Sequence, residues 1–290
     1  MRTIGMLIAI SFFLPQVYAQ SLLQGMFDAQ LALNQSITEN GPNAGFNGFL
    51  SEDAVLFRPG PVNGKKFLTS SRIGPSGVAA RKIDFADISV NGLLGYSYGE
   101  WKLTQKLKTG EDVRNGQYAT VWRKTPDGRY RAVLDIEISH DAADLPRPPG
   151  PLPTAPVRDR NERGWSAADT TMNFFRLSMA SDGLGGAYRR FAAEDVRLLR
   201  EGMPPIIGKR DVMKQTERYV SIEYPTQVTQ FETADLAYSW NPCKFSNSNE
   251  GLEEGHCLHI WKLRDEKWWI VLGVFSKMAD PRPPSLRERN

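Results

Sequence analysis

The sequence has few of the residues from which metal sites and many catalytic sites are built. Its 290 residues include two cysteines and three histidines, too few for a disulfide framework or a zinc site with four thiolates. The sequence also has little excess charge, because 36 basic residues are nearly balanced by 33 acidic ones and the net charge is +3. Such a balance disfavours nucleic acid or an anionic membrane as the partner. The composition is that of a globular protein, and at roughly 150 residues per domain the length predicts two domains.

Long hydrophobic runs are absent except near the start of the chain. There, an apolar stretch over residues 4–14 follows a basic residue and precedes Pro15 and the small residues Val17 and Ala19. This order is typical of a secretory signal peptide. We therefore predict a signal peptide over residues 1–19, and a periplasmic or secreted chain with no membrane span after cleavage. The alternative is an uncleaved anchor, although a bilayer span needs about 20 apolar residues.

The two cysteines become informative in an oxidising compartment. Cys243 and Cys257 lie at the facing ends of two predicted neighbouring strands, around a polar loop over residues 246–254. A disulfide that closes a loop of this length would stabilise the fold by about 3 kcal/mol. The alternative is two unpaired buried thiols.

One sequence pattern occurs twice. Residues 46–60 align without gaps with residues 188–202, at an offset of 142 residues, and residues 116–122 align with residues 255–261. The matched pairs in the first alignment include Phe49 with Phe191, Asp53 with Asp195, Arg58 with Arg200 and Gly60 with Gly202. Such an ordered series indicates a tandem duplication.

A proline-rich segment separates the two copies. Six prolines lie between Leu145 and Pro156, which favours an extended, semi-rigid spacer; the alternative is a motif for a proline-binding partner. The predicted parts are a first domain over residues 20–140, a linker over 141–164, a second domain over 165–278 and a tail rich in proline and arginine over 279–290.

Each copy begins with helical patterns and ends with strand patterns. In the first copy, apolar residues recur at helical spacing from Leu22 to Leu33, and Asn40 and Gly41 end the run. Alternating apolar and polar residues then predict four strands, over residues 81–91, 94–103, 116–124 and 129–139. Helices followed by strands predict an α+β fold, with the helices packed on one face of a curved antiparallel sheet.

Three segments of the first copy resemble a known superfamily. They are GYSYGEW from Gly95, GQYATVWRK from Gly116 and PDGRYRAVLD from Pro126. These segments are similar to SnoaL-like members of the nuclear transport factor 2-like superfamily, in the branch of unknown function related to ketosteroid-isomerase-like proteins. The second copy matches more loosely, through DLAYSW from Asp235 and residues 255–275. The resemblance implies two cone-shaped α+β barrels with pockets, but it leaves function open because the superfamily includes enzymes, ligand binders and oligomerisation modules.

Asp135 is the candidate catalytic residue. It shares one strand face with Glu137; if that face lines a dry pocket, its pKa would be raised and it could act as a general base. If the face meets water, both acids are solvated charges. Gly273 takes the matching position in the second copy, so this role would be confined to the first. The tyrosine that ketosteroid-isomerase chemistry needs on the first helix is absent, and that helix carries Phe27.

Aromatic and imidazole side chains on the strands are candidates for lining an apolar ligand pocket. The residues expected there are Tyr98, Trp101, Tyr118, Trp122, Tyr238, His259 and Trp261. The alternative is that they only pack the sheets. His256 and His259 are three residues apart on one strand and hence on opposite faces, so we expect no metal site. Arg58 and Arg200 each follow a strand, and we expect a structural carboxylate partner for both.

These features predict an exported tandem SnoaL-like protein that binds a small apolar or amphipathic molecule, or a protein partner, without catalysis and without a cofactor. The alternative is an isomerase, dehydratase or cyclase that uses Asp135. A third interpretation is an interaction protein, in which the two sheets pair with each other or the chain forms a homodimer.

Overall fold

The computed structural model describes seven stretches of the chain. They are residues 13–41, 43–58, 60–70, 78–141, 165–223, 229–247 and 251–278. Most of the predicted signal peptide, nearly all of the predicted linker and the predicted tail lie outside the described residues, so these boundaries stay predictions.

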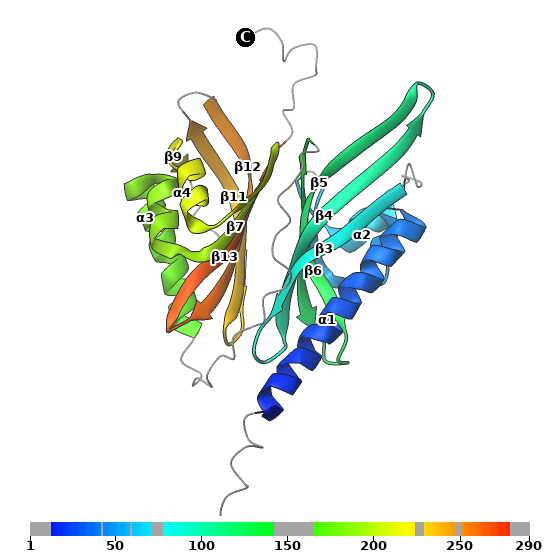
Figure 1. The fold of residues 1–290 in the computed structure, drawn as a ribbon, viewed down its shortest axis with the longest axis horizontal. Helices are drawn as coiled ribbons and strands as arrows, with labels where there is room; N and C mark the ends of the chain where they lie inside the picture. Colours follow the sequence, from blue (N-terminus) through cyan, green and yellow to red (C-terminus); the bar gives the residue numbers. More distant parts are fainter. Residues whose placement is uncertain are drawn as a thin grey trace, which may run out of the picture.

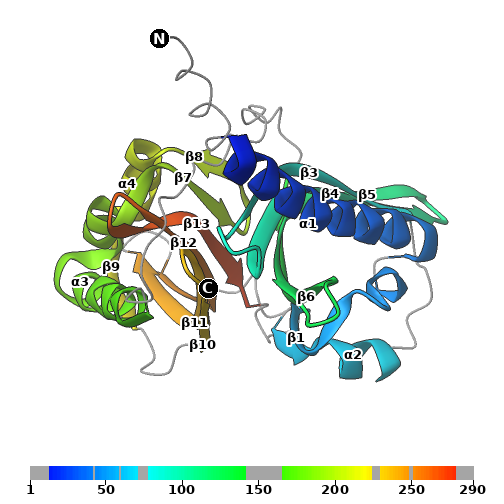
Figure 2. The ribbon, with the colours of Figure 1, turned by 90° about the horizontal axis from the view of Figure 1, so that it is seen from below.

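Helices of the first half lie against one face of its sheet (Figures 1 and 2). The long helix α1 spans Phe13–Asn40, the 3₁₀ turn η1 spans Ala44–Phe46, and the short helix α2 spans Gly64–Ser70. Helix α1 ends where the sequence predicts, because Gly41 has a φ of 88°, which glycine adopts at little cost.

The first sheet has six strands in the order β2-β1-β6-β5-β4-β3. Its strands are β1 (Leu50–Phe57), β2 (Pro61–Asn63), β3 (Val78–Ile88), β4 (Leu94–Leu107), β5 (Gly110–Lys124) and β6 (Tyr130–His140). The predicted meander is present as β3 to β6, paired antiparallel throughout. Strand β1 returns to pair in parallel with β6, so the sheet is mixed.

The second half repeats this order of elements. Helix α3 (Trp165–Phe191) is two helices joined at Gly183, whose φ of 71° is non-helical, and α4 spans Lys209–Thr216. The strands are β7 (Ala192–Arg200), β8 (Met203–Ile207), β9 (Tyr219–Glu223), β10 (Thr229–Glu232), β11 (Leu236–Asn247), β12 (Gly251–Arg264) and β13 (Lys267–Lys277). They form a sheet in the order β10-β11-β12-β13-β7-β8, with β9 also on β11. The predicted α+β class is thus confirmed in both halves.

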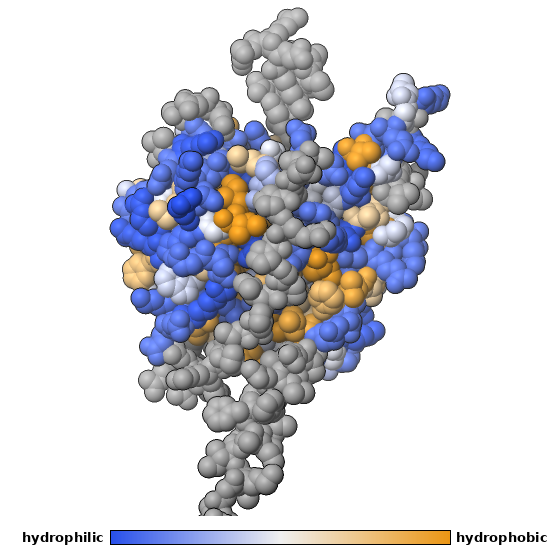
Figure 3. All heavy atoms as spheres, viewed as in Figure 1, coloured by the Kyte–Doolittle hydropathy of each residue, from blue (hydrophilic) through white to orange (hydrophobic). Residues whose placement is uncertain are grey.

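A single apolar cluster lies between the two sheets, which face each other with the helices outside (Figures 1 and 2). Buried residues from both halves form it, including Phe85 and Ile136 from the first and Tyr238 and Leu258 from the second. In Figure 3 the visible hydrophobic residues gather mainly toward the middle of this face, between the halves. Burial of apolar surface therefore holds the two sheets together.

Polar contacts fix how the sheets face each other. The ammonium group of Lys262 lies 3.2 Å from Asp87 and 3.1 Å from Asp235, and it donates to the Ile88 carbonyl at 2.9 Å. Asp235 also accepts from the amide of Val90 at 2.8 Å. Since a buried charge needs partners in a fixed geometry, this network favours one arrangement of the halves.

Each half also has its own core between helices and sheet. In the first it includes Met26, Phe46 and Trp122, and in the second Phe175 and Trp261. Among the helices of the described residues, none has a long enough apolar stretch to cross a membrane.

Candidate functional site

Asp135 lies inside the first half, on the helix-facing side of β6. Its side chain is fully buried, and Arg81 from β3 donates to both of its oxygens at 2.9 Å. Thr120 donates at 2.7 Å, and Arg58, just after β1, at 3.2 Å. Glu137 completes the cluster by pairing with both arginines. The two carboxylates are therefore matched by two guanidinium groups.

The pKa of Asp135 is lowered, not raised. Burial alone would raise it, but the charge and hydrogen bonds of Arg81, with help from Arg58 and Thr120, outweigh burial and lower the pKa of the carboxyl group. The expectation of a raised pKa in a dry pocket was wrong because strand periodicity could not reveal Arg81, which lies 54 residues away in the chain. An ionised carboxylate whose lone pairs are occupied is poorly suited to take a proton from a substrate.

A β-bulge explains a second departure from the expected pattern. Strand alternation places Ala132, Leu134 and Ile136 on one face, yet Ala132 packs under the helices while Leu134 and Ile136 lie between the sheets. The pairing of β5 with β6 shifts at this point, so that Val133 is the extra residue. The bulge changes which face each side chain takes.

The arginines at the matched positions both have carboxylate partners, as expected. Arg58 pairs with Asp135 and Glu137, and Arg200 pairs with Glu253. The guanidinium of Arg200 also lies 4.5 Å from the ring centre of Tyr219, a cation–π contact. This prediction is confirmed.

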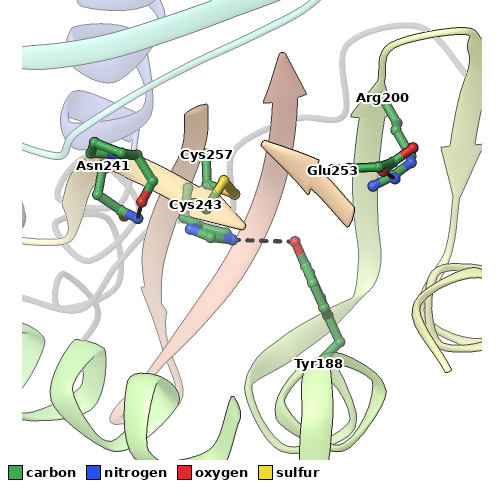
Figure 4. The surroundings of a disulfide bond; sticks show 8 residues. Tyr188, Arg200, Asn241, Cys243, Glu253 and Cys257 are labelled. Carbon is green, nitrogen blue, oxygen red and sulfur yellow. Dashed lines mark hydrogen bonds and ion pairs between the residues drawn. A yellow bond between two sulfur atoms is a disulfide. The ribbon is translucent and has the colours of Figure 1, made fainter. Parts of the chain in front are cut away.

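Side-chain packing fills the corresponding interior of the second half. His259 takes the sheet position of Thr120, and Gly273 takes that of Asp135. A Cβ atom on Gly273 would lie 2.5 Å from the hydroxyl of Tyr188, so the missing side chain makes room for Tyr188. That hydroxyl lies 3.2 Å from Nε2 of His259; Figure 4 shows Tyr188 pointing from its helix toward the sheet.

The remaining space in this interior is small. Burial lowers the pKa of His259 to about 3, so the ring is neutral at physiological pH. The cavity beside it, lined also by Tyr188 and Arg200, measures about 10 Å³, near the minimum that one water molecule needs. A substrate of ordinary size does not fit there.

A disulfide joins Cys243 of β11 to Cys257 of β12, with their Cα atoms 6.0 Å apart (Figure 4). The two strands run further than expected, to Asn247 and from Gly251, so the polar segment between the cysteines is mostly hairpin strand. Both cysteines are buried in the core between the sheet and its helices.

The residues expected to line one ligand pocket are divided between two faces. Tyr98 and Tyr238 lie between the sheets. The indoles of Trp122 and Trp261 instead lie in the cores between sheet and helices. That of Trp122 donates to Gln30 of α1 at 3.0 Å, and that of Trp261 donates to Ser239 of β11 at 3.1 Å.

The other residues of that expected set are also packed. The ring of Tyr118 lies 4.4 Å from the guanidinium of Arg81, and the indole of Trp101 donates to the carbonyl groups of Gln117 and Ile138. With His259 enclosed in the second half, the structure does not bring this set into a common pocket.

A larger groove, which no sequence pattern predicts, lies at the edge of the first half. It has a volume of about 610 Å³ and lies between α1, the start of β1 and the hairpin that joins β5 to β6. Its lining residues are Leu22, Gly25 and Ala29 of α1, Gly48 and Phe49, Lys124, and residues 128–131. The basic residues beside the hairpin turn were visible in the sequence, but the helix that faces them is about 100 residues away in the chain.

Glycines leave this groove open. A Cβ atom on Gly25 would meet Tyr130 at an ordinary 3.6 Å, and one on Gly48 or Gly128 would meet nothing within 4 Å. Larger side chains at these positions would extend into the space. In the described part of the chain, no three potential metal-ligating side chains of His, Cys, Asp or Glu come together.

Comparison with known proteins gives matches only among solved structures. No protein-family model matches the sequence, and no curated protein sequence matches it. A nuclear transport factor 2-like protein of unknown function from Shewanella oneidensis MR-1 is 18% identical, with a TM-score of 0.32, over 39% of this chain and 96% of its own. A ketosteroid isomerase-like protein from Erwinia carotovora atroseptica SCRI1043 is 12% identical, with a TM-score of 0.33, over 41% of this chain and all of its own.

A nuclear transport factor 2-like superfamily protein from Salmonella enterica serovar Typhimurium str. LT2 is 15% identical, with a TM-score of 0.33, over 47% of this chain and 95% of its own. The solved structures thus include proteins of the superfamily that the sequence resembles. Each likeness is too low for a function to be carried to this chain.

Proposed function

We propose that this protein is an exported, non-catalytic binding protein that holds a small amphipathic molecule in the groove beside α1. The groove volume of about 610 Å³ is the observation that carries the proposal, since small-molecule sites usually measure about 300–1,000 Å³. Leu22, Ala29 and Phe49 supply apolar surface there, and Lys124 supplies a polar end.

The surroundings of Asp135 and His259 support binding over catalysis. Asp135 is held by Arg81, and His259 is enclosed beside a cavity of about 10 Å³. An isomerase, dehydratase or cyclase would need one of these groups beside a space for its substrate, so the enzyme alternative has less support.

Isothermal titration calorimetry with 1-decanol and decanoate, both below their aggregation concentrations, tests this proposal. We expect at least one of them to bind to the wild-type protein. Gly25→Leu should weaken binding more than tenfold by filling the groove, whereas Gly25→Ala, the matched control, should change it less than twofold. No binding to the wild type, or equal binding by both variants, would overturn the proposal.

Export is supported by the apolar stretch before Pro15 and by the disulfide between Cys243 and Cys257, because disulfides persist in oxidising compartments. Fractionation of a Gram-negative host followed by N-terminal sequencing tests it. We expect a chain that begins at Gln20 in the periplasm or medium; an uncleaved chain in the cytoplasm would contradict the proposal.

We also propose that the chain is monomeric, because its two sheets cover each other through one apolar cluster. Light scattering coupled to size exclusion should give the mass of one chain. A stable dimer at micromolar concentration would contradict this part of the proposal and leave the groove unaffected.

A further inference from the structure

The charges that line the groove are all of one sign. Lys124, Arg129 and Arg131 are among its lining residues, and none of the ten described residues that line it is acidic. The whole chain is nearly balanced, with 36 basic and 33 acidic residues. The groove therefore carries an excess of positive charge that the whole chain lacks, and this charge attracts anions.

Of these cations, Lys124 faces α1 and has no carboxylate partner among the described residues. Arg129 pairs with Asp127 of the same turn, which offsets its charge. Lys124, the last residue of β5, instead lies 5.8 Å from the ring centre of Tyr130, its pairing partner on β6. Arg131 pairs with Arg123, so its side chain points to the opposite face of the sheet. The positive charge of Lys124 is thus available to a ligand.

Apolar residues occupy the opposite side of the same groove. Leu22 and Ala29 of α1 are two helical turns apart, about 10 Å along the helix axis, and Phe49 faces the same space. Between them, Gly25 leaves room for a guest. An apolar side and a basic side together match a molecule with a hydrocarbon tail and an anionic head.

We infer that the groove takes a free single-chain amphiphile with an anionic head, such as a carboxylate or sulfate. The tail lies between α1 and Phe49, and the head lies beside Lys124. This inference rests on the proposed binding function and adds the chemical class of the ligand. A membrane lipid could offer a similar head group, so the experiment separates the two sources.

The experiment compares 1-decanol, decanoate and decyl sulfate by isothermal titration calorimetry, with the same tail length and monomeric ligands. We expect the two anions to bind about tenfold more tightly than the alcohol, with the difference falling as salt rises. Lys124→Gln should weaken decanoate binding about five- to tenfold, several times more than it weakens binding of 1-decanol. Lys102→Gln, an exposed lysine of β4 outside the groove, is the matched control and should change neither.

The outcomes separate this inference from the proposed function. Equal affinity for decanol and decanoate, or loss of binding of both ligands in Lys124→Gln, would refute the inference that the ligand has an anionic head group. The proposed binding function would not be affected by that result. Absence of binding for all three ligands would overturn both. Cosedimentation with phosphatidylglycerol vesicles in the absence of monomer binding would overturn the choice of a free amphiphile.

Discussion

Lys262 is the residue whose loss should most weaken the contact between the two halves. Its side chain is 7% exposed, and those of its partners Asp87 and Asp235 are 6% and 2% exposed. Water therefore cannot replace the ammonium group. Lys262→Met keeps most of the aliphatic stem and leaves two buried carboxylates without a cation.

Removing one partner of a buried ion pair costs about 3–5 kcal/mol. We expect that loss in the free energy of unfolding at pH 7, a large share of the 5–15 kcal/mol typical of folded proteins. Urea unfolding followed by tryptophan fluorescence and far-ultraviolet circular dichroism measures it.

The control is Lys65→Met, because Lys65 pairs with Glu52 and their side chains are 43% and 86% exposed. Its loss should cost less than about 1 kcal/mol. A triple variant that also carries Asp87→Asn and Asp235→Asn has no charge in the network and should recover most of the stability. A loss below about 1 kcal/mol in Lys262→Met, or a triple variant no more stable than the single one, would refute the reasoning.

Three further predictions concern the interiors of the two halves. Replacing Cys243 and Cys257 with serine should lower the free energy of unfolding by about 3 kcal/mol, since the cysteines are 14 residues apart; an unchanged urea midpoint would contradict this. Burial lowers the pKa of His259 to about 3 in the native state, whereas in the unfolded chain this imidazole has a pKa near 6.5. Between these two pH values the unfolded chain binds a proton and the native state does not. The contribution of neutral His259 to the free energy of unfolding is complete above pH 6.5. It falls as the pH drops toward 3, by about 2 kcal/mol at pH 5. His259→Gln should flatten that part of the stability profile, and parallel profiles would count against the assignment. Arg81→Met should cost about 3–5 kcal/mol because Asp135 is left buried without its bidentate partner, and a thermal unfolding midpoint like that of the wild type would disprove it.

Much of the local structure follows from residues that are neighbours in the chain. Gly41 ends α1, as the Asn-Gly pair predicts, and Gly183 interrupts α3; both glycines have a positive φ. The α+β class was predictable for the same reason, since alternation and turn chemistry depend on short windows of sequence. Strand ends were less predictable, because β4 and β5 extend beyond the apolar pattern as a projecting hairpin (Figure 1).

The site was less predictable than the fold. The carboxylate partners of Arg58 and Arg200 were expected from their matched positions, but the pKa of Asp135 depends on Arg81, which no local pattern connects to it. The filling of the second interior depends on Tyr188, which comes from a helix and enters the space that Gly273 leaves.

The sequence by itself determined that one pattern of helices and strands occurs twice, because propensity, periodicity and turn residues act over a few neighbouring positions. Only the tertiary structure decided which sheet faces meet, which charges are neutralised and where open space remains. Those outcomes depend on contacts such as that of Val90 with Asp235, 145 residues apart, and on the bulge at Val133, which changes the face that the flanking side chains take. The balanced charge of the whole chain likewise gave no sign of the basic groove, because charge is balanced over the sequence but separated in space.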